Sequence, residues 1–197
     1  MILFKIALLS VTLFMPKPTR MLDADITSYI EDYKYLAIDE MVRTGIPASI
    51  TMAQAIIESN AGTSKLARMT NNHFGIKFKD YWTGLEYFFP DDDRDSNGNL
   101  IPSCFRKYPT VRDSYIDHSN FLMYSENYAP LFSYDKTEYV LWAQGLSLCR
   151  YASDERYAEK LIRTIETYDL HELDYYTIEF VERLPELPIQ GQTSSME

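Results

Sequence analysis

Hydrophobic positions recur at helical spacing from residue 25 to residue 44. This stripe, which Gly45 ends, consists of Ile26, Tyr29, Ile30, Tyr33, Leu36, Ala37, Glu40 and Met41, and only Glu40 in it is polar. Residues 46–62 repeat the spacing, with Pro47 suited to a first helical turn and Gly62 to a left-handed stop. The pattern therefore predicts two successive helices, followed by a short helix over residues 63–69.

The pattern changes after residue 70. Residues 71–78 alternate partly between polar and apolar side chains, residues 82–90 are strand-like, and residues 101–108 form a third extended piece. Residues 91–99 read as a polar loop or turn between the last two pieces. This part of the chain predicts a small β lobe or hairpin.

Helical spacing returns in the second half of the chain. Residues 112–125 form one predicted helix, a capping box at residues 135–138 opens a second one, and Ser153 with Asp154 caps a third. Helices, a short β insertion and then helices predict an α+β fold. We expect a cleft between a helical lobe and a β lobe, with Glu58 at the junction.

Composition narrows the possible partners. The chain has 197 residues, enough for one domain with a core, and its 46% hydrophobic content argues against disorder. Its formal net charge of −10 argues against a nucleic-acid partner, because phosphate binding requires a basic patch. The 16 tyrosines and 10 phenylalanines suit a carbohydrate-binding surface, although core packing accounts for aromatic residues equally well.

Cysteines and histidines give no metal or disulfide framework. Cys104 and Cys149 are too few for a disulfide scaffold, and the sequence leaves open whether they pair. His73, His118 and His171 are far apart in the chain and have no metal-ligand spacing. We expect neither a metal nor a cofactor.

The N-terminus resembles an export signal. Residues 6–15 are mostly apolar and are flanked by Lys5 and Arg20, as in a short signal-peptide core. We predict a leader over residues 1–24, a catalytic domain over residues 25–174 and a tail over residues 175–197. The alternative for the leader is an ordinary N-terminal helix or strand. No apolar stretch is long enough for an ordinary membrane span.

Glu58 is the best candidate for chemistry. It lies in the last turn of the second predicted helix, at the edge of the apolar face. Both the helix macrodipole at a C-terminus and partial burial raise the pKa of a carboxyl group there. A carboxyl group protonated near neutral pH is what a general acid needs. The alternative is an ordinary surface glutamate.

An ordered set of short motifs resembles a known family. The set comprises Gln54-Ala55-Ile56-Ile57-Glu58-Ser59, Asn72-His73-Phe74-Gly75-Ile76-Lys77, Trp82-Thr83-Gly84, Phe105-Arg106-Lys107-Tyr108, Ser114-Tyr115-Ile116-Asp117-His118, Trp142-Ala143-Gln144-Gly145-Leu146 and Tyr151-Ala152-Ser153-Asp154. Over roughly residues 25–174 the chain is similar to glycoside hydrolase family 73, the endo-β-N-acetylglucosaminidases. The resemblance implies a lysozyme-like fold and cleavage of the β-1,4 bond between N-acetylglucosamine and N-acetylmuramic acid in peptidoglycan. It gives Glu58 the role of general acid.

Glycoside hydrolysis usually needs a second carboxylate. The resemblance implies that it lies on the β lobe, where this chain has Asp91, Asp92 and Asp93, and Asp92 is the best placement. Glu86 is another candidate, and the acetamido group of the substrate is an alternative nucleophile. The acidic run also matches the first half of a calcium-binding loop, but Cys104 stands where that loop needs a glutamate.

Further residues are expected to meet the glycan. Tyr151 matches a family tyrosine that faces the cleft, although Arg150 stands before it where the family usually has glycine. Asn72, Phe74 and Trp82 are candidates for lining the sugar groove, together with Asp91 and Asp93. For the neighbours Asp117 and His118, a buried structural hydrogen bond is the favoured reading.

Two other functions fit the same motifs. A lytic transglycosylase shares the lysozyme-like fold and needs only one carboxyl group. A cell-wall glycan-binding module with an inactive site is the second alternative, suggested by the aspartates and Arg150. The leading prediction is an exported peptidoglycan hydrolase of the glucosaminidase type, with glycan strands as its partner.

Overall fold

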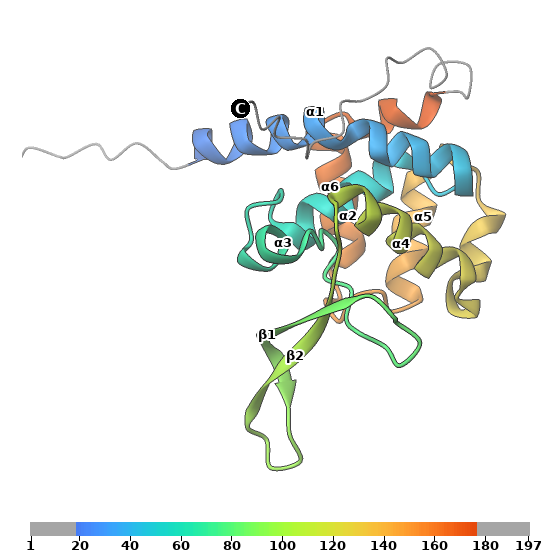
Figure 1. Ribbon diagram of the computed structural model, residues 1–197. Helices are drawn as coiled ribbons and strands as arrows, with labels where there is room; N and C mark the ends of the chain where they lie inside the picture. Colours follow the sequence, from blue (N-terminus) through green and yellow to red (C-terminus); the bar gives the residue numbers. More distant parts are fainter. Residues whose placement is uncertain (1–18, 177–197) are drawn as a thin grey trace, which may run out of the picture.

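The computed structural model describes the backbone of residues 19–176 and the side chains of residues 25–91 and 94–176. The elements, in chain order, are α1 (Thr19–Thr44), α2 (Ala48–Ser59), α3 (Lys65–Thr70), β1 (Leu85–Arg94), β2 (Leu100–Lys107), α4 (Val111–Tyr124), the 3-10 helix η1 (Glu126–Ser133), α5 (Tyr139–Leu148), α6 (Tyr157–Thr167) and the 3-10 helix η2 (Leu170–Tyr175). The helices form one body, and the β1–β2 hairpin projects from it (Figure 1). The α+β prediction is confirmed. The predicted leader lies mostly outside the described residues, and α1 begins within its last part.

Helix α2 runs through the centre of the helical body. All of its residues except Ile57 and Glu58 are buried, including the polar Thr51 and Gln54. It packs against α1, α5, α6 and η2, and large buried side chains such as Trp142 surround it. A helix that is buried nearly all round belongs to the core rather than to the surface. The position of Glu58 is therefore fixed by the most buried element of the protein.

Both ends of α2 are held by specific contacts. Pro47 directly precedes its first residue and provides no side-chain cap. The cap comes from Asp174 of η2. Its carboxylate accepts one hydrogen bond from the Ser49 backbone N–H, at 2.8 Å, and another from the Ser49 hydroxyl, at 2.6 Å. At the other end Asn60, with φ 52°, takes the left-handed conformation that was predicted for Gly62. Gly62 also has a positive φ, two residues further along.

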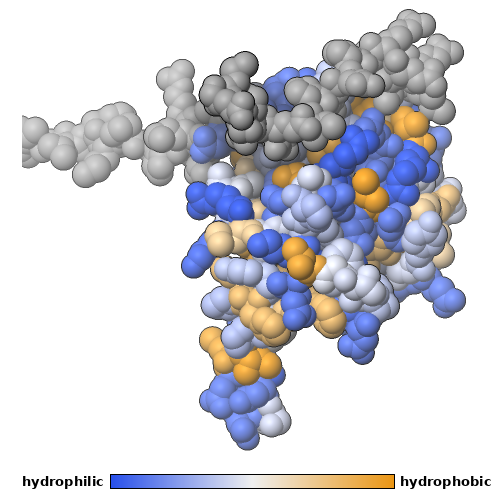
Figure 2. Space-filling model, viewed as in Figure 1, coloured by the Kyte–Doolittle hydropathy of each residue, from blue (hydrophilic) through white to orange (hydrophobic). Residues whose placement is uncertain are grey.

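The β lobe is a two-stranded antiparallel hairpin. Its register runs from Leu85 opposite Lys107 to Pro90 opposite Pro102, with an irregularity between Pro90 and Arg94. Because β1 continues to Arg94, the prediction of a loop beginning at residue 91 was wrong for its first four residues. Leu85, Phe88 and Leu100 are more than half exposed, and Figure 2 shows hydrophobic side chains gathered on the hairpin.

Residues 71–78 do not form the predicted strand. Only residues 76–78 pair with β2, through a bridge between Lys77 and Phe105. The Arg106 N–H donates to the Ile76 carbonyl at 3.0 Å, and the Phe78 N–H donates to the Cys104 carbonyl at 2.8 Å. The buried Asn72 amide holds the preceding irregular loop, since its nitrogen donates to the carbonyls of Ile76 and Arg106 and its oxygen accepts from the Ile76 N–H. One buried side chain thus satisfies the backbone groups of an irregular segment.

An ion pair anchors the base of the hairpin to α4. The Arg106 guanidinium donates twice to Asp117, at 3.0 and 2.7 Å, and lies 4.7 Å from the Trp82 ring centre. The Tyr108 hydroxyl also donates to Asp117, at 2.6 Å. Arg106 is almost fully buried, so a movement of the hairpin relative to α4 would break a buried ion pair.

Within the described part of the chain, no helix has the length and apolar character needed to cross a bilayer. The cysteine thiols of Cys104 and Cys149 are both free.

Candidate active site

Glu58 meets α6 through a single hydrogen bond. The Tyr157 hydroxyl donates to Glu58 Oε1 at 2.8 Å and accepts from Gln54 Nε2 at 3.2 Å. Gln54 and Glu58 lie one turn apart on α2, so they contact the same hydroxyl from one helix face. Glu58 Oε2 has no hydrogen-bond partner among the described residues. One carboxylate oxygen is fixed, and the other is available to hold a proton.

The surroundings of Glu58 favour its protonated form. Burial raises the pKa of this carboxyl group, and the Tyr157 hydrogen bond and the positive charge of Lys160 oppose that rise without cancelling it. Lys160 also forms an ion pair with Asp154, which divides its attraction between two carboxylates. The sequence predicted a raised pKa for Glu58 from burial and from the helix dipole. Burial is the main cause of the raised pKa in the structure.

Tyr151 lies beside the Glu58 contact. Its ring stacks on that of Tyr157, with centres 5.6 Å apart and planes 17° from parallel. Burial and the negative charge of Glu58 both raise the pKa of the Tyr151 hydroxyl, so it keeps its proton. The structure thus brings together Glu58 and Tyr151, two of the three predicted catalytic residues.

Arg150 adopts the backbone that glycine would allow. Its φ is 54°, in the left-handed region that most side chains avoid. The Tyr151 N–H then bonds to the Leu146 carbonyl at 3.0 Å and closes the end of α5. The departure from glycine therefore leaves the turn in place, at the cost of local strain.

The other predicted groove residues are placed differently. Asn72 and Phe74 are buried, at 1% and 3% exposure, and Asn72 is used within its own loop. Phe74 stacks on His118 with ring centres 3.9 Å apart. Trp82 is partly exposed but leans against Tyr108 and Arg106 at the hairpin base. None of these three contacts Glu58.

Asp117 and His118 behave differently from each other. Asp117 makes the expected structural hydrogen bonds, to Arg106 and Tyr108. His118 is fully buried, and neither of its ring nitrogens has a hydrogen-bond partner within the described part of the chain. Burial lowers the pKa of His118 to about 3, so the ring is neutral. Its ring centre lies 6.0 Å from that of Tyr151, with the ring planes 74° apart, so it supports the Tyr151 ring by packing.

The acidic residues of the hairpin lie at different distances along β1 from its base. Glu86 is the second residue of β1, opposite Arg106 at the anchored base. Asp91 lies five residues further toward the turn, roughly 17 Å along an extended strand. The Asp91 carboxylate pairs with Lys77 at 2.8 Å and accepts from the Ser103 hydroxyl at 3.3 Å. The side chains of Asp92 and Asp93 lie outside the described ones.

The segment that resembles the first half of a calcium-binding loop, residues 93–98, lies at the hairpin turn. Asp95 Oδ1 accepts from the N–H groups of Asn97 and Asn99, at 2.8 and 2.9 Å, and closes the hairpin turn. No group of three or more potential metal ligands occurs among the described residues.

Tyr157 and Lys160 are the site residues that sequence reasoning missed. Tyr157 is the first residue of α6 and only 2% exposed. The usable signal was that α6 starts six residues after Tyr151, so its first turn must lie near the same site. Nothing in the sequence indicated which residue of α2 the Tyr157 hydroxyl would contact.

A helical body with a central acid-bearing helix and a small β hairpin defines a lysozyme-like glycoside hydrolase domain. The family model described as mannosyl-glycoprotein endo-β-N-acetylglucosaminidase matches residues 34–170. The chain therefore belongs to the glucosaminidase family.

Individual relatives agree with this membership. The chain is 35% identical over 133 residues to exo-glucosaminidase LytG of Bacillus subtilis, covering 64% of this chain and 45% of that protein. It resembles the solved structure of an N-acetylmuramoyl-L-alanine amidase from Staphylococcus aureus, with a TM-score of 0.66, 28% identity and coverage of 86% and 50%. It also resembles the catalytic domain of the autolysin Auto from Listeria monocytogenes, with a TM-score of 0.61, 25% identity and coverage of 82% and 91%. The chain spans less than half the length of the first curated relatives it matches.

Proposed function

We propose that this protein hydrolyses peptidoglycan, cleaving the β-1,4 bond between N-acetylglucosamine and N-acetylmuramic acid. The observation that carries the proposal is the state of Glu58: its pKa is raised by burial, Oε1 is fixed by Tyr157, and Oε2 has no partner among the described residues. Family membership and the names of the relatives, which include autolysin and peptidoglycan hydrolase, support the choice of substrate.

In the proposed reaction Glu58 gives its proton to the glycosidic oxygen as the bond breaks. The sugar that keeps the anomeric carbon then carries developing positive charge. The ionised Glu58 left behind is stabilised by the Tyr157 hydroxyl and by Lys160, which both favour the carboxylate. The Tyr151 hydroxyl, held by stacking, is proposed to position the acetamido group of the substrate.

Two positions compete for the second carboxylate. Asp92 is the sequence-based prediction, and it lies on the outer half of the hairpin. Glu86 lies at the base that Arg106 and Asp117 anchor, six residues before Asp92 along β1 and nearer to the helical body. A group that must act within a few ångströms of the same bond as Glu58 needs a fixed position. We therefore favour Glu86, whose Oε2 accepts a weak hydrogen bond from the Cys104 thiol at 3.4 Å.

Mass spectrometry of digested peptidoglycan tests the proposal. We expect wild-type protein to release hydrated fragments with reducing N-acetylglucosamine ends, and Glu58→Gln to release none. Fragments of several disaccharides early in the digest indicate internal cleavage, whereas single sugars indicate cleavage from the ends. Anhydro-muramyl ends would instead identify a lytic transglycosylase, and wall binding without any products would identify a binding module.

The same digest compares Glu86→Gln with Asp92→Asn. Loss of a catalytic carboxylate is expected to lower kcat by about 100-fold or more, while the other variant stays within about threefold of wild type. If both variants keep full activity, Asp91→Asn and Asp93→Asn are compared in the same digest. Full activity in all four variants would leave the acetamido group of the substrate as the nucleophile.

The proposed substrate lies outside the cytoplasm, so the proposal includes export. Residues 1–24 are the proposed leader, as predicted from their sequence. Separating secreted from cell-bound protein, with and without residues 1–24, tests this assignment.

A further inference from the structure

A pocket of about 440 Å³ opens between α1, the loop after α2, and α3. Its lining includes Ala61 and Gly62, which begin three residues after Glu58, but Glu58 itself is not part of it. The volume falls in the range of sites that hold small-molecule ligands. The pocket is thus a separate feature that shares the C-terminal end of α2 with the acid.

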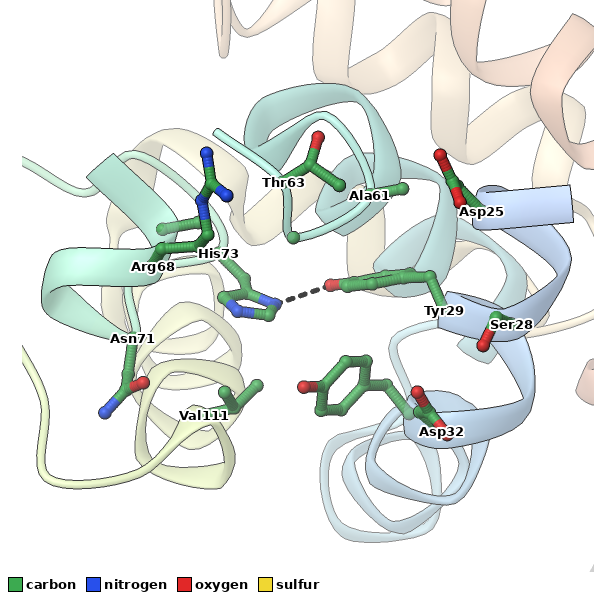
Figure 3. Close-up of a pocket in the computed structure, with 13 residues that line it drawn as sticks. Asp25, Ser28, Tyr29, Asp32, Ala61, Thr63, Arg68, Asn71, His73 and Val111 are labelled. Carbon is green, nitrogen blue, oxygen red and sulfur yellow. Dashed lines mark hydrogen bonds between the residues drawn. The ribbon is translucent and has the colours of Figure 1, made fainter. Parts of the chain in front are cut away.

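The floor of the pocket is polar and uncharged. The Tyr29 hydroxyl is 2.7 Å from His73 Nδ1 and 3.1 Å from the Tyr115 hydroxyl, and all three side chains are buried. Burial lowers the pKa of His73 to about 4 and raises the pKa of both tyrosines. Figure 3 shows the Tyr29–His73 hydrogen bond crossing the middle of the pocket.

The rim carries opposite charges on facing walls. Arg68 lies on the α3 side, and Asp25 and Asp32 lie on the α1 side, as Figure 3 shows. All three are exposed, and none has an ion-pair partner among the described residues. The Asn71 amide nitrogen donates to the carbonyls of Tyr108 and Pro109, so its oxygen remains as an acceptor for the pocket.

We propose that this pocket binds an amino-acid or short-peptide group that carries both a free ammonium and a carboxylate. Arg68 suits a carboxylate, because its guanidinium offers paired donors to both oxygens. Asp25 and Asp32 suit an ammonium on the opposite side. A neutral sugar would leave all three charges without a counterpart, and a simple anion would meet two carboxylates.

Two kinds of ligand carry both a free ammonium and a carboxylate. Peptidoglycan bears short stem peptides whose diamino acid has both groups, and choosing this source rests on the function proposed above. Free amino acids or cell-wall turnover peptides carry the same groups. The position of the pocket next to the end of α2 favours a peptide attached to the glycan that Glu58 acts on.

Calorimetric titration of the full chain tests the pocket without turnover. The probes are the tripeptide L-alanyl-γ-D-glutamyl-meso-diaminopimelate, its N-acetylated triamide, free meso-diaminopimelate and tetra-N-acetylchitotetraose. The variants are Arg68→Gln and Asp32→Asn, with Arg163→Gln and Glu126→Gln as controls, since these exposed residues lie outside the pocket. Thermal melts verify that every variant folds.

We expect the tripeptide to bind, with affinity lowered about tenfold or more in both pocket variants and less than twofold in the controls. The blocked tripeptide and the chitotetraose are expected to bind at least about tenfold more weakly than the free tripeptide at this site. If free meso-diaminopimelate binds as tightly as the tripeptide, the proposed ligand chemistry is supported and the ligand is a free amino acid. If no charged probe binds, or if the pocket variants bind like wild type, the proposal is overturned.

The result is independent of the proposed hydrolysis. Glu58→Gln is expected to bind the tripeptide as wild type does, because Glu58 does not line the pocket. Tripeptide binding without peptidoglycan cleavage would overturn the proposed function alone. Cleavage without tripeptide binding would overturn the pocket alone.

Discussion

Replacing Tyr157 by phenylalanine removes one hydroxyl group and keeps the ring that stacks on Tyr151. The hydroxyl donates to Glu58 Oε1 at 2.8 Å, which stabilises the ionised carboxylate. It therefore holds the pKa of Glu58 below the value that burial alone would set. In Tyr157→Phe we expect that pKa to rise, so that Glu58 stays protonated to higher pH.

The size of the shift follows from the strength of the lost bond. A hydrogen bond to a charged group contributes about 1.5–3 kcal/mol, and one pKa unit corresponds to about 1.4 kcal/mol. The partial exposure of Glu58 reduces the effect through solvent screening, so we expect a rise of about one unit. The alkaline limb of the kcat/KM profile reports the pKa of the general acid in the free enzyme. That limb should move up by about one pH unit.

The assay is the rate of release of reducing ends from purified peptidoglycan, measured across the pH range. Tyr124→Phe is the matched control, because this tyrosine is 76% exposed at the end of α4 and its hydroxyl makes no described hydrogen bond. Tyr157→Phe also leaves Gln54 Nε2 buried without its acceptor, which is expected to cost about 1–3 kcal/mol of unfolding free energy. An alkaline limb that stays in place or moves down in a folded variant would refute the role of Tyr157.

Two further substitutions test the framework of the site. Arg106→Gln removes the cationic partner of Asp117 and leaves it only the Tyr108 hydroxyl, so it is expected to cost about 3–5 kcal/mol in urea unfolding. Arg112→Gln at a surface pair should cost less than about 1 kcal/mol. Burial raises the pKa of Asp174 from 3.8 to about 6, so its contribution to stability is full below pH 3.8 and is lost as pH rises through 6. Asp174→Asn should therefore remove on the order of 3 kcal/mol of the stability change between pH 4 and 7, and equal pH slopes for the two proteins would contradict this.

The helical elements and the position of Glu58 could be predicted because local sequence determines them. The predicted bounds of α2 and α4 lie within three residues of the observed ones, whereas α1 begins six residues before its predicted start. Helix α6 begins at Tyr157, three residues after the predicted cap at Asp154, and has no side-chain cap. The paired hairpin strands were predicted from two strand-like runs separated by a polar turn. The last turn of α2 contains Glu58, as the spacing indicated.

The predictions failed where a distant side chain replaces a local signal. Residues 71–78 alternate like a strand, but only residues 76–78 pair with β2, and the Asn72 amide binds backbone groups of Ile76 and Arg106 beside the irregular part. Asp174, which lies 125 residues after Ser49, caps α2 through a contact that no local pattern announces. The contact of Tyr157 with Glu58 spans 99 residues for the same reason.

Gln54 and Glu58 connect the packing of the helical body to the protonation of the Glu58 carboxyl group. Both contact the Tyr157 hydroxyl, and the buried Gln54 amide fixes that hydroxyl where it can donate to Glu58. Since α2 and α6 pack in the core, a shift of α6 would weaken the packing and the hydrogen bond together. Burial and the hydrogen bond act on the pKa of Glu58 in opposite directions, so the protonation of the acid depends on how closely α6 sits. Core substitutions on the α6 face toward α2 should therefore alter the pH profile as well as the stability, although they touch no substrate.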